Sequence, residues 1–253
     1  MIDIHSHILP GLDDGARDLD QSVAMVRLAA GAGTTDIVAT PHSDLEYTYD
    51  LETVEQKIAE LTAATGGAVR IHRGCDFHMY YENIHDALEN PSRYTINGKK
   101  YLLIEFSELL IPQTTEEVLR RMFEAGIVPV VTHPERNSLL RNHFPRLEMW
   151  AQSGCCLQVT AQSFFGKFGE RAKRFSDDLV SRGLVHVVAS DAHDTVHRPP
   201  RLDEAHQYIE KRCGRETADL LCVKNPSAML SGEPIQHPYP APLRARKWYR
   251  FWQ

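Results

Sequence analysis

Residues 1–16 read MIDIHSHILPGLDDGA, a predicted strand followed by a loop. Side chains of types that bind metal stand at the end of the strand and in the loop. The apolar run that begins it predicts a short β-strand. Residues i and i+2 of a strand point to the same side, so the imidazoles of His5 and His7 can bind one ion together. Two aspartates, Asp13 and Asp14, follow in the loop. The stretch therefore indicates a metal site at the carboxyl end of a strand.

The rest of the chain alternates strand and helix in the same way. Short apolar, β-branched runs predict seven strands, at residues 2–5, 36–40, 68–73, 101–106, 127–132, 156–160 and 185–190. Amphipathic stretches lie between them, and Gly126 and Gly183 stand where helices are expected to end. Because no hairpin signal joins two strands, we expect an α/β fold with a parallel sheet, which closes most simply into a barrel.

Side chains of metal-binding types stand at or just past the ends of six of these strands. In a parallel barrel those ends form the face that carries the active site. Carboxylates gathered on one axis would repel one another unless cations neutralised them, and Asp or Glu can bridge two ions. The residues concerned are His5, His7, Asp13, Asp14, His42, Asp76, His78, Glu105, His133, Asp191 and His193. Of these, we interpret Asp13 as a loop or cap residue, and His78 as an ordinary surface or core side chain that could supplement the site.

Composition limits the partners and the compartment. The chain has 253 residues, 42% of them hydrophobic, and a net charge of −6 with histidine neutral. An acidic chain has no general electrostatic reason to bind nucleic acid, so an anionic substrate must be held locally, by metal or a few arginines. The first residues do not read as a signal peptide, and no apolar run approaches the about 20 residues of a membrane span. Five cysteines, an odd number, favour a reducing compartment, and we expect a cytoplasmic protein.

Other chemistries lack their motifs. A cysteine phosphatase needs Cys and Arg separated by five residues, and none of the five cysteines has an arginine at that spacing. The sequence contains no GxxxxGK[ST], no GxGxxG and no GxSxG. No two cysteines have the CxxC spacing of a zinc site. Metal chemistry at histidine and carboxylate ligands is the favoured alternative.

The segments HSH, LDDGA, ATPH, Gly-Cys-Asp, IEF, HPER and SDAH occur in this order, and together they resemble the PHP (polymerase and histidinol phosphatase) superfamily. Within it, MIDIHSHILPGLDDGA, VATPH, HPERN and VASDAH are similar to the bacterial PHP-type tyrosine-protein phosphatases of capsule and exopolysaccharide clusters. The resemblance runs from residue 1 to about residue 200. It implies a distorted TIM-like (β/α)7 barrel that holds three divalent metal ions, manganese above all, with iron or zinc as alternatives.

The resemblance also implies which residues bind the ions, with Asp76 as the bridging carboxylate. The implied ligands are His5, His7, Asp191 and Asp76 for the first ion, Asp76, Glu105 and His133 for the second, and Asp14, His42 and His193 for the third. The family usually has Glu at the bridging position. Asp76 is one methylene shorter, which leaves the metal preference, affinity and rate open.

Two arginines match phosphate-binding positions of the family, Arg136 in HPER and Arg198 after SDAH. The implied substrate is phosphotyrosine on a tyrosine autokinase that controls capsular or exopolysaccharide synthesis. We expect direct hydrolysis, in which a metal-bound hydroxide attacks phosphorus and the two arginines hold the phosphoryl oxygens. Two alternatives stay open: a PHP phosphatase for a small metabolite such as histidinol phosphate, and a metal-stabilised protein that binds a kinase tail without turnover.

The C-terminal end differs in composition from the rest. We assign residues 1–231 to the phosphatase domain and 232–253 to a tail that is first proline-rich and then basic and aromatic. The tail either packs its aromatic side chains on the domain or docks to a partner or an anionic membrane surface. The sequence does not predict the oligomeric state.

Overall fold

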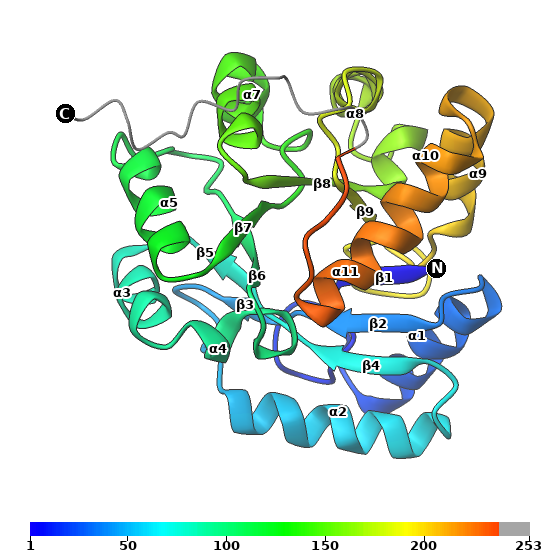
Figure 1. The fold of residues 1–253 in the computed structure, drawn as a ribbon. Helices are drawn as coiled ribbons and strands as arrows, with labels where there is room; N and C mark the ends of the chain where they lie inside the picture. The colour runs from blue at the N-terminus through cyan, green and yellow to red at the C-terminus, as the bar shows by residue number, and fades with distance from the viewer. Residues whose placement is uncertain (238–253) are drawn as a thin grey trace.

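The computed structural model describes residues 1–237, so most of the predicted tail, from residue 238 on, lies outside the described residues. The strands are β1 (Ile2–Ser6), β2 (Asp36–Ala39), β3 (His42–Ser43), β4 (Arg70–Arg73), β5 (Asp76–His78), β6 (Tyr101–Glu105), β7 (Val128–Val131), β8 (Cys156–Thr160) and β9 (Val187–Ala189). They pair in parallel, in the orders β1-β2-β4 and β3-β5-β6-β7-β8-β9, within a strongly curled sheet (Figure 1). The predicted parallel α/β arrangement is confirmed.

Two of the predicted strands, at residues 36–40 and 68–73, are each followed by a further short strand that was not predicted. Strand β2 continues as β3 after a break at Pro41, and β4 continues as β5 after a break at Gly74. Pairing persists across the breaks, because the N–H of Gly74 donates to the carbonyl of Ala39 (2.9 Å) and that of Asp76 to the carbonyl of Pro41 (3.1 Å). A Cβ on Gly74 would lie 2.8 Å from a methyl of Val38, so only glycine permits this close approach.

The curled sheet closes between its last and first strands. The N–H of Asp191 donates to the carbonyl of His5 (2.9 Å), and the N–H of His7 donates to the carbonyl of Ala192 (2.8 Å). Between these bonds Ser6 and Ala192 form a parallel bridge. The strands thus follow one another around a TIM-like barrel in chain order, and the ends of β1 and β9 lie side by side.

Buried Asp3 also joins β1 to the end of β9. Its carboxylate accepts hydrogen bonds from the N–H (3.0 Å) and the hydroxyl (2.5 Å) of Ser190. Because a buried carboxylate without partners would be costly, these bonds fix the position of Ser190, directly before Asp191.

Helices cover the outside of the barrel (Figure 1). Two of the long ones begin at aspartate caps: Asp18 accepts from the N–H of Gln21 and Asp50 from the N–H of Thr53. The helices are α1 (Leu19–Gly31), α2 (Leu51–Thr65), α3 (Tyr81–Glu89), α4 (Pro91–Tyr94), α5 (Thr115–Glu124), α6 (Ser138–Asn142), α7 (Phe144–Gln152), α8 (Glu170–Ser181), α9 (Asp203–Cys213), α10 (Arg215–Asp219) and α11 (Asn225–Ser231). Among residues 1–237, no helix combines the length and apolarity needed to cross a bilayer.

The apolar core has two parts. The larger part packs the helices against the outer face of the sheet, with Met25, Phe77 and Trp150 among its buried members. The smaller part fills the barrel between the strands and includes Ile4 and Leu103. Met229 of α11 belongs to this inner cluster, and Leu230 and Ile235 pack against it. Helix α11 thus lies against the amino-terminal halves of the strands, which leaves their carboxyl ends free for a site.

Candidate metal centre

The carboxyl ends of the strands bring all nine ligands implied by the resemblance into one cluster. Its members form four overlapping groups, and within each group one ligand atom per residue lies within 4.8 Å of the others. The groups are His7, Asp14, His42 and His193; His42, Asp76, His78 and Glu105; His5, His7 and Asp76; and His5, His133 and Asp191. The structure therefore adds His78 to the implied set. The assignment of individual ions to ligands stays a prediction.

His5 lies at the centre of the cluster. The β1–β2 ladder contains one extra residue between Asp3 and Ser6, a β-bulge of the kind that redirects side chains beside active sites. Nδ1 of His5 lies 2.9 Å from the amide oxygen of Gln158, which only accepts, so Nδ1 carries the proton. Nε2 is thereby available to a metal, and it lies 3.4 Å from Oδ2 of Asp76 and 3.4 Å from Oδ1 of Asp191.

His7 is oriented by Asp13, the residue that the sequence placed in a loop or cap role. Oδ2 of Asp13 lies 2.7 Å from Nδ1 of His7, and Oδ1 accepts from the N–H of Gly15 (2.9 Å). Nε2 of His7 then faces Oδ1 of Asp191 at 3.3 Å. A Cβ on Gly15 would lie 2.1 Å from the carbonyl oxygen of His7, so glycine is required where this loop folds back on β1. The aspartate has both roles: it holds the loop and fixes the imidazole.

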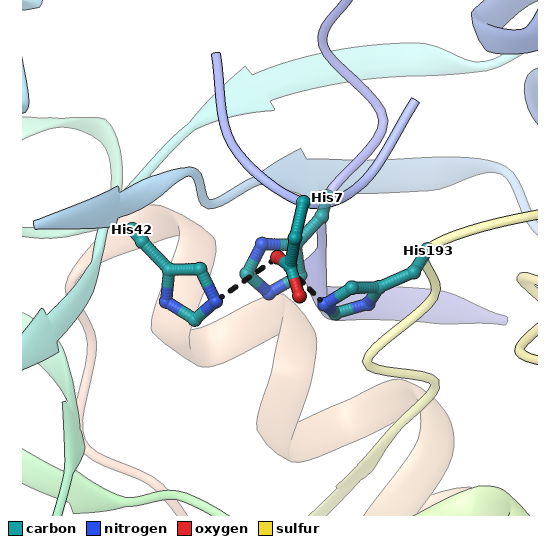
Figure 2. Close-up of side chains that lie close together, drawn as sticks. His7, His42 and His193 are labelled. Atoms are coloured by element: carbon teal, nitrogen blue, oxygen red, sulfur yellow. Dashed lines mark ion pairs between the residues drawn. The ribbon is translucent and has the colours of Figure 1, made fainter. Parts of the chain in front are cut away.

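Asp14 joins two further histidines. Its Oδ1 lies 3.4 Å from Nε2 of His42 and 3.2 Å from Nε2 of His193. Figure 2 shows the rings of His7, His42 and His193 turned toward one another, and the ring of His7 lies 4.0 Å from that of His193, centre to centre. Half of the Asp14 side chain is exposed, whereas His7 is buried. This part of the cluster is therefore its side open to solvent.

Asp76 and Glu105 occupy the other side of the cluster. Oδ2 of Asp76 lies 3.3 Å from Nδ1 of His42. Oε2 of Glu105 lies 2.9 Å from Nε2 of His78, and Oε1 lies 3.6 Å from Nε2 of His133. The imidazole of His42 thus has one nitrogen toward Asp14 and the other toward Asp76.

Two members of the cluster stand on an unusual backbone. His133 has φ 32° and Asp191 has φ 51°, in the left-handed region that residues other than glycine rarely adopt. Both follow the last residues of a strand, β7 and β9. Such conformations cost free energy and concentrate at functional sites, where the surrounding structure enforces them. Here the turn directs each side chain back over the end of the barrel.

Arg136 and Arg198 lie beside the cluster, as their motif positions predict. Each guanidinium pairs with Oδ2 of Asp191, through Nη1 of Arg136 and Nη2 of Arg198. The guanidinium carbon of Arg136 also lies 4.3 Å from the centre of the Phe168 ring. About a fifth of each arginine side chain is exposed, so an anion arriving from solvent can reach both.

Glu135, between His133 and Arg136, is a supporting residue that the sequence analysis missed. It is fully buried, and its Oε1 accepts from the N–H of Thr160 (2.9 Å) and the hydroxyl of Ser163 (2.6 Å). Burial raises the pKa of this carboxyl. The bonds hold the loop after β7 against the end of β8. Its position inside the HPER segment was the sequence feature that could have indicated this role.

The chemistry of the unpaired atoms fits divalent cations. Several buried ligand atoms have no hydrogen-bond partner within residues 1–237: Nδ1 of His42, both carboxylate oxygens of Asp76, Nε2 of His78 and Oε2 of Glu105. Buried polar atoms without partners are costly and therefore uncommon. Neutral imidazole nitrogen and carboxylate oxygen are the ligand types of Zn²⁺, Mn²⁺ and Fe²⁺. These atoms are therefore of the types that bind divalent cations, and hydrogen bonds within residues 1–237 do not satisfy them.

The surroundings favour positive charge at one histidine of the cluster and disfavour it at another. Burial alone would lower the pKa of His5, but the carboxylates of Asp76 and Asp191 outweigh it and raise that pKa to about 9. Burial and the neighbouring His7 lower the pKa of His193 to about 4. A metal ion must displace the proton of His5, whereas His193 offers its lone pair already at neutral pH.

A parallel α/β barrel with histidines, carboxylates and two arginines at the carboxyl ends of its strands defines the class of metal-dependent hydrolases. The comparisons with known proteins narrow the class. A family profile described as "Capsular polysaccharide synthesis, CpsB/CapC" matches residues 1–231. The chain is 34% identical to the tyrosine-protein phosphatase YwqE of Bacillus subtilis, over 99% of this chain and 100% of YwqE. It is 32% identical to the tyrosine-protein phosphatase CpsB of Streptococcus pneumoniae, over 93% and 100%.

A solved structure agrees with this result. A chain from work on YwqE of B. subtilis and CpsB of S. pneumoniae, described as unique metal-dependent tyrosine phosphatases, has a TM-score of 0.88 to this chain at 34% identity. The match covers 96% of this chain and 100% of the other. The chain therefore belongs to the CpsB/CapC family of capsular polysaccharide synthesis, which agrees with the resemblance to PHP-type tyrosine phosphatases.

Proposed function

We propose that this protein is a metal-dependent tyrosine-protein phosphatase of capsular or exopolysaccharide synthesis. The observation that carries the proposal is the convergence of the His and carboxylate cluster with Arg136 and Arg198 at one end of the barrel. Membership of the CpsB/CapC family, with relatives named as tyrosine-protein phosphatases, supports the same activity.

The residues of the chain divide the work between them. Arg136 and Arg198 bind the phosphoryl oxygens, because a guanidinium fork matches their geometry and their charge. Asp191 keeps both arginines in place until substrate arrives. Divalent ions held by the cluster supply, when bound, Lewis acidity and a nucleophilic water near neutral pH. We propose three ions, with manganese as the physiological metal.

Cysteine takes no part in this reaction. Within the described residues all five cysteines are free thiols, and only Cys213 is exposed. Cys75, directly before Asp76, is fully buried, and burial raises the pKa of its thiol well above the usual value. A buried neutral thiol is a poor nucleophile, so hydrolysis proceeds without a phosphocysteine.

A specific observation favours a protein substrate over a small metabolite. Large apolar side chains that are exposed within residues 1–237 lie almost entirely in segments that follow a strand, on the face of the barrel that carries the cluster; the exception is Met149 of α7. They are Leu45, Tyr81, Leu109, Leu110, Phe165 and Val196, which we call the apolar rim. Because these side chains follow several different strands, a phosphorylated polypeptide would contact more of them than histidinol phosphate.

We propose that the substrate is a phosphotyrosine-bearing tyrosine autokinase, that the reaction takes place in the cytoplasm and that nucleic acid is not a partner. The test is turnover of a phosphotyrosine peptide, a phosphoserine peptide and histidinol phosphate by protein loaded with Mn²⁺ and by protein stripped with EDTA. The proposal predicts that loaded protein hydrolyses the phosphotyrosine peptide best. Preference for histidinol phosphate would favour the metabolite alternative, and tight peptide binding without turnover would favour the non-catalytic binder.

A further inference from the structure

The histidine that the resemblance left unassigned lies in a group of four donors. His42, Asp76, His78 and Glu105 each offer one ligand atom, and these four atoms lie within 4.8 Å of one another. Nδ1 of His42 lies 3.3 Å from Oδ2 of Asp76 and 3.8 Å from Oε2 of Glu105, and Nε2 of His78 lies 2.9 Å from Oε2 of Glu105. Ligands at about 2.0–2.2 Å from an ion and at right angles to one another lie about 3 Å apart. The separation of His78 and Glu105 is close to this value, and the other two distances are somewhat longer.

The same four atoms lack hydrogen bonds. Each is buried and has no hydrogen-bond partner in the described part of the chain. This holds even for Nε2 of His78 and Oε2 of Glu105, whose 2.9 Å separation is within hydrogen-bond reach but whose geometry is not that of a hydrogen bond. An ion pair or a shared cation would account for this short separation, and only a shared cation would also use the lone pair of a neutral imidazole.

The position of His42 makes a second imidazole necessary here. A neutral imidazole has one lone pair on its ring nitrogens, so His42 can bind only one ion. It binds either an ion beside Asp14 and His193, through Nε2, or an ion beside Asp76 and Glu105, through Nδ1. If Nε2 binds the ion beside Asp14, Nδ1 carries the proton and is not a metal ligand. Three of the four atoms then remain as donors: Oδ2 of Asp76, Nε2 of His78 and Oε2 of Glu105. The ion between Asp76 and Glu105 then receives its nitrogen on this side from His78.

We propose that Nε2 of His78 is a ligand of the ion held between Asp76 and Glu105. The inference rests on the metal dependence of the proposed function, and it adds one ligand to that site. A further imidazole makes the site softer, since nitrogen donors favour Zn²⁺, Fe²⁺ or Co²⁺ more than carboxylate oxygens do. It follows that the metal preference of this protein depends on residue 78.

Three substitutions at His78 separate a ligand from an ion-pair partner. His78→Ala removes the donor. His78→Glu supplies a carboxylate oxygen of similar reach. His78→Lys keeps a positive charge opposite Glu105, but an ammonium group has no lone pair for a metal. The matched control is His85 on α3, whose half-exposed ring pairs only with Glu89 among the ion pairs of residues 1–237. His85→Ala, His85→Glu and His85→Lys are made in the same way.

The readout is metal affinity, measured by competition with a chelator for Mn²⁺ and for Co²⁺, with bound metal counted by mass spectrometry and folding checked by circular dichroism. We expect His78→Ala and His78→Lys to weaken one ion by at least tenfold, since even outer-shell changes cost 10–100-fold. His78→Glu should stay within a few-fold of wild type for Mn²⁺, and the His85 variants should be unchanged. Wild-type affinity in His78→Ala, or retention in His78→Lys with loss in His78→Glu, would overturn the inference. Metal binding by wild type without phosphotyrosine turnover would overturn only the proposed function.

Discussion

Arg136 and Arg198 donate to the same carboxylate oxygen, Oδ2 of Asp191. The other oxygen of that carboxylate, Oδ1, lies 3.4 Å from Nε2 of His5 and 3.3 Å from Nε2 of His7. One side chain thus separates the cationic arginines from the metal cluster, and the burial of Asp191 concentrates the field on both sides. Under the proposed function, a phosphoryl group entering this region would meet arginine on one side and the cluster on the other.

The arginines should affect catalysis and leave the metal in place. Arg136→Ala or Arg198→Ala removes a charge-assisted contact to the phosphoryl group. The loss of transition-state stabilisation should be about 2 kcal/mol or more, which lowers kcat/KM by a factor of tens. Metal content should equal that of wild type. Steady-state kinetics and metal analysis on the same preparations check both. Arg182→Ala, which removes an exposed ion pair with Asp178 just after the end of α8, is the control. Loss of metal in either active-site variant would show that the arginine supports Asp191 instead.

Asp76 should behave in the opposite way. Its side chain is fully buried between His5 and His42, and both carboxylate oxygens lack hydrogen bonds within residues 1–237. Asp76→Ala should therefore remove at least one ion and most of the turnover together. Asp76→Glu keeps the carboxylate, extends it by one methylene and should retain activity with an altered metal preference. Full metal content and wild-type turnover in Asp76→Ala would show that another residue bridges the ions.

The apolar rim should matter for a polypeptide and not for a small substrate. Leu109 and Leu110 are neighbours in the chain, and their exposed fractions are 92% and 66%. Replacing both by Ser should raise KM for a phosphotyrosine peptide by roughly fivefold, equivalent to about 1 kcal/mol of lost apolar contact. Turnover of p-nitrophenyl phosphate should not change. Met149→Ser, an exposed apolar side chain on α7, is the matched control, and equal effects on both substrates would rule out a docking role.

His186 should make the protein less stable in mild acid. It is buried, its Nδ1 accepts from the N–H of Leu157 (3.0 Å), and burial together with the neighbouring His237 lowers its pKa to about 3. The unfolded chain, with a pKa near ~6.5, binds this proton first as the pH falls. Stability from this group is therefore present above pH ~6.5 and is lost as the pH falls toward the folded value.

The measurement is urea unfolding in EDTA at pH 6.5 and pH 5.5. Wild type should lose about 1 kcal/mol more over this interval than His186→Asn, whose amide can accept the same hydrogen bond but does not titrate. Because the other histidines are common to both proteins, the difference isolates His186. Parallel pH profiles for the two proteins would mean that this imidazole takes up its proton without unfolding.

The parallel α/β arrangement could be predicted because each strand is a short apolar run and an amphipathic stretch separates it from the next. The breaks at Pro41 and Gly74 could not. They depend on contact between neighbouring strands, which is so close at Gly74 that an added Cβ would lie 2.8 Å from Val38. Such a contact cannot be read from the linear sequence. The helices after β7 were likewise not predicted individually, since α6 is too short for a periodic pattern.

The candidate ligands could be proposed because few residue types bind metal, and residues of these types stand at the ends of the predicted strands. The residues that orient them could not. Gln158 supports His5 from β8, and nothing in the surrounding sequence marks this glutamine as different from other polar strand residues. Asp13 looks like a loop aspartate because it also is one. Its second role depends on the distance to His7, which only the folded loop defines.

The junction of β1 with β9 has a consequence for how the protein folds. His5 and His7 stand at one side of this junction, Asp191 and His193 at the other, and only a few backbone hydrogen bonds and one bridge join the two strands there. The ligand set does not exist in the unfolded chain, so metal uptake and barrel closure are thermodynamically linked. An ion at a free concentration 100 times its Kd adds about 2.7 kcal/mol per site. Amide hydrogen exchange at His7 and Asp191 should accordingly speed up on chelation more than exchange within β6 and β7. Bound metal would then stabilise the closed barrel at the junction of β1 with β9.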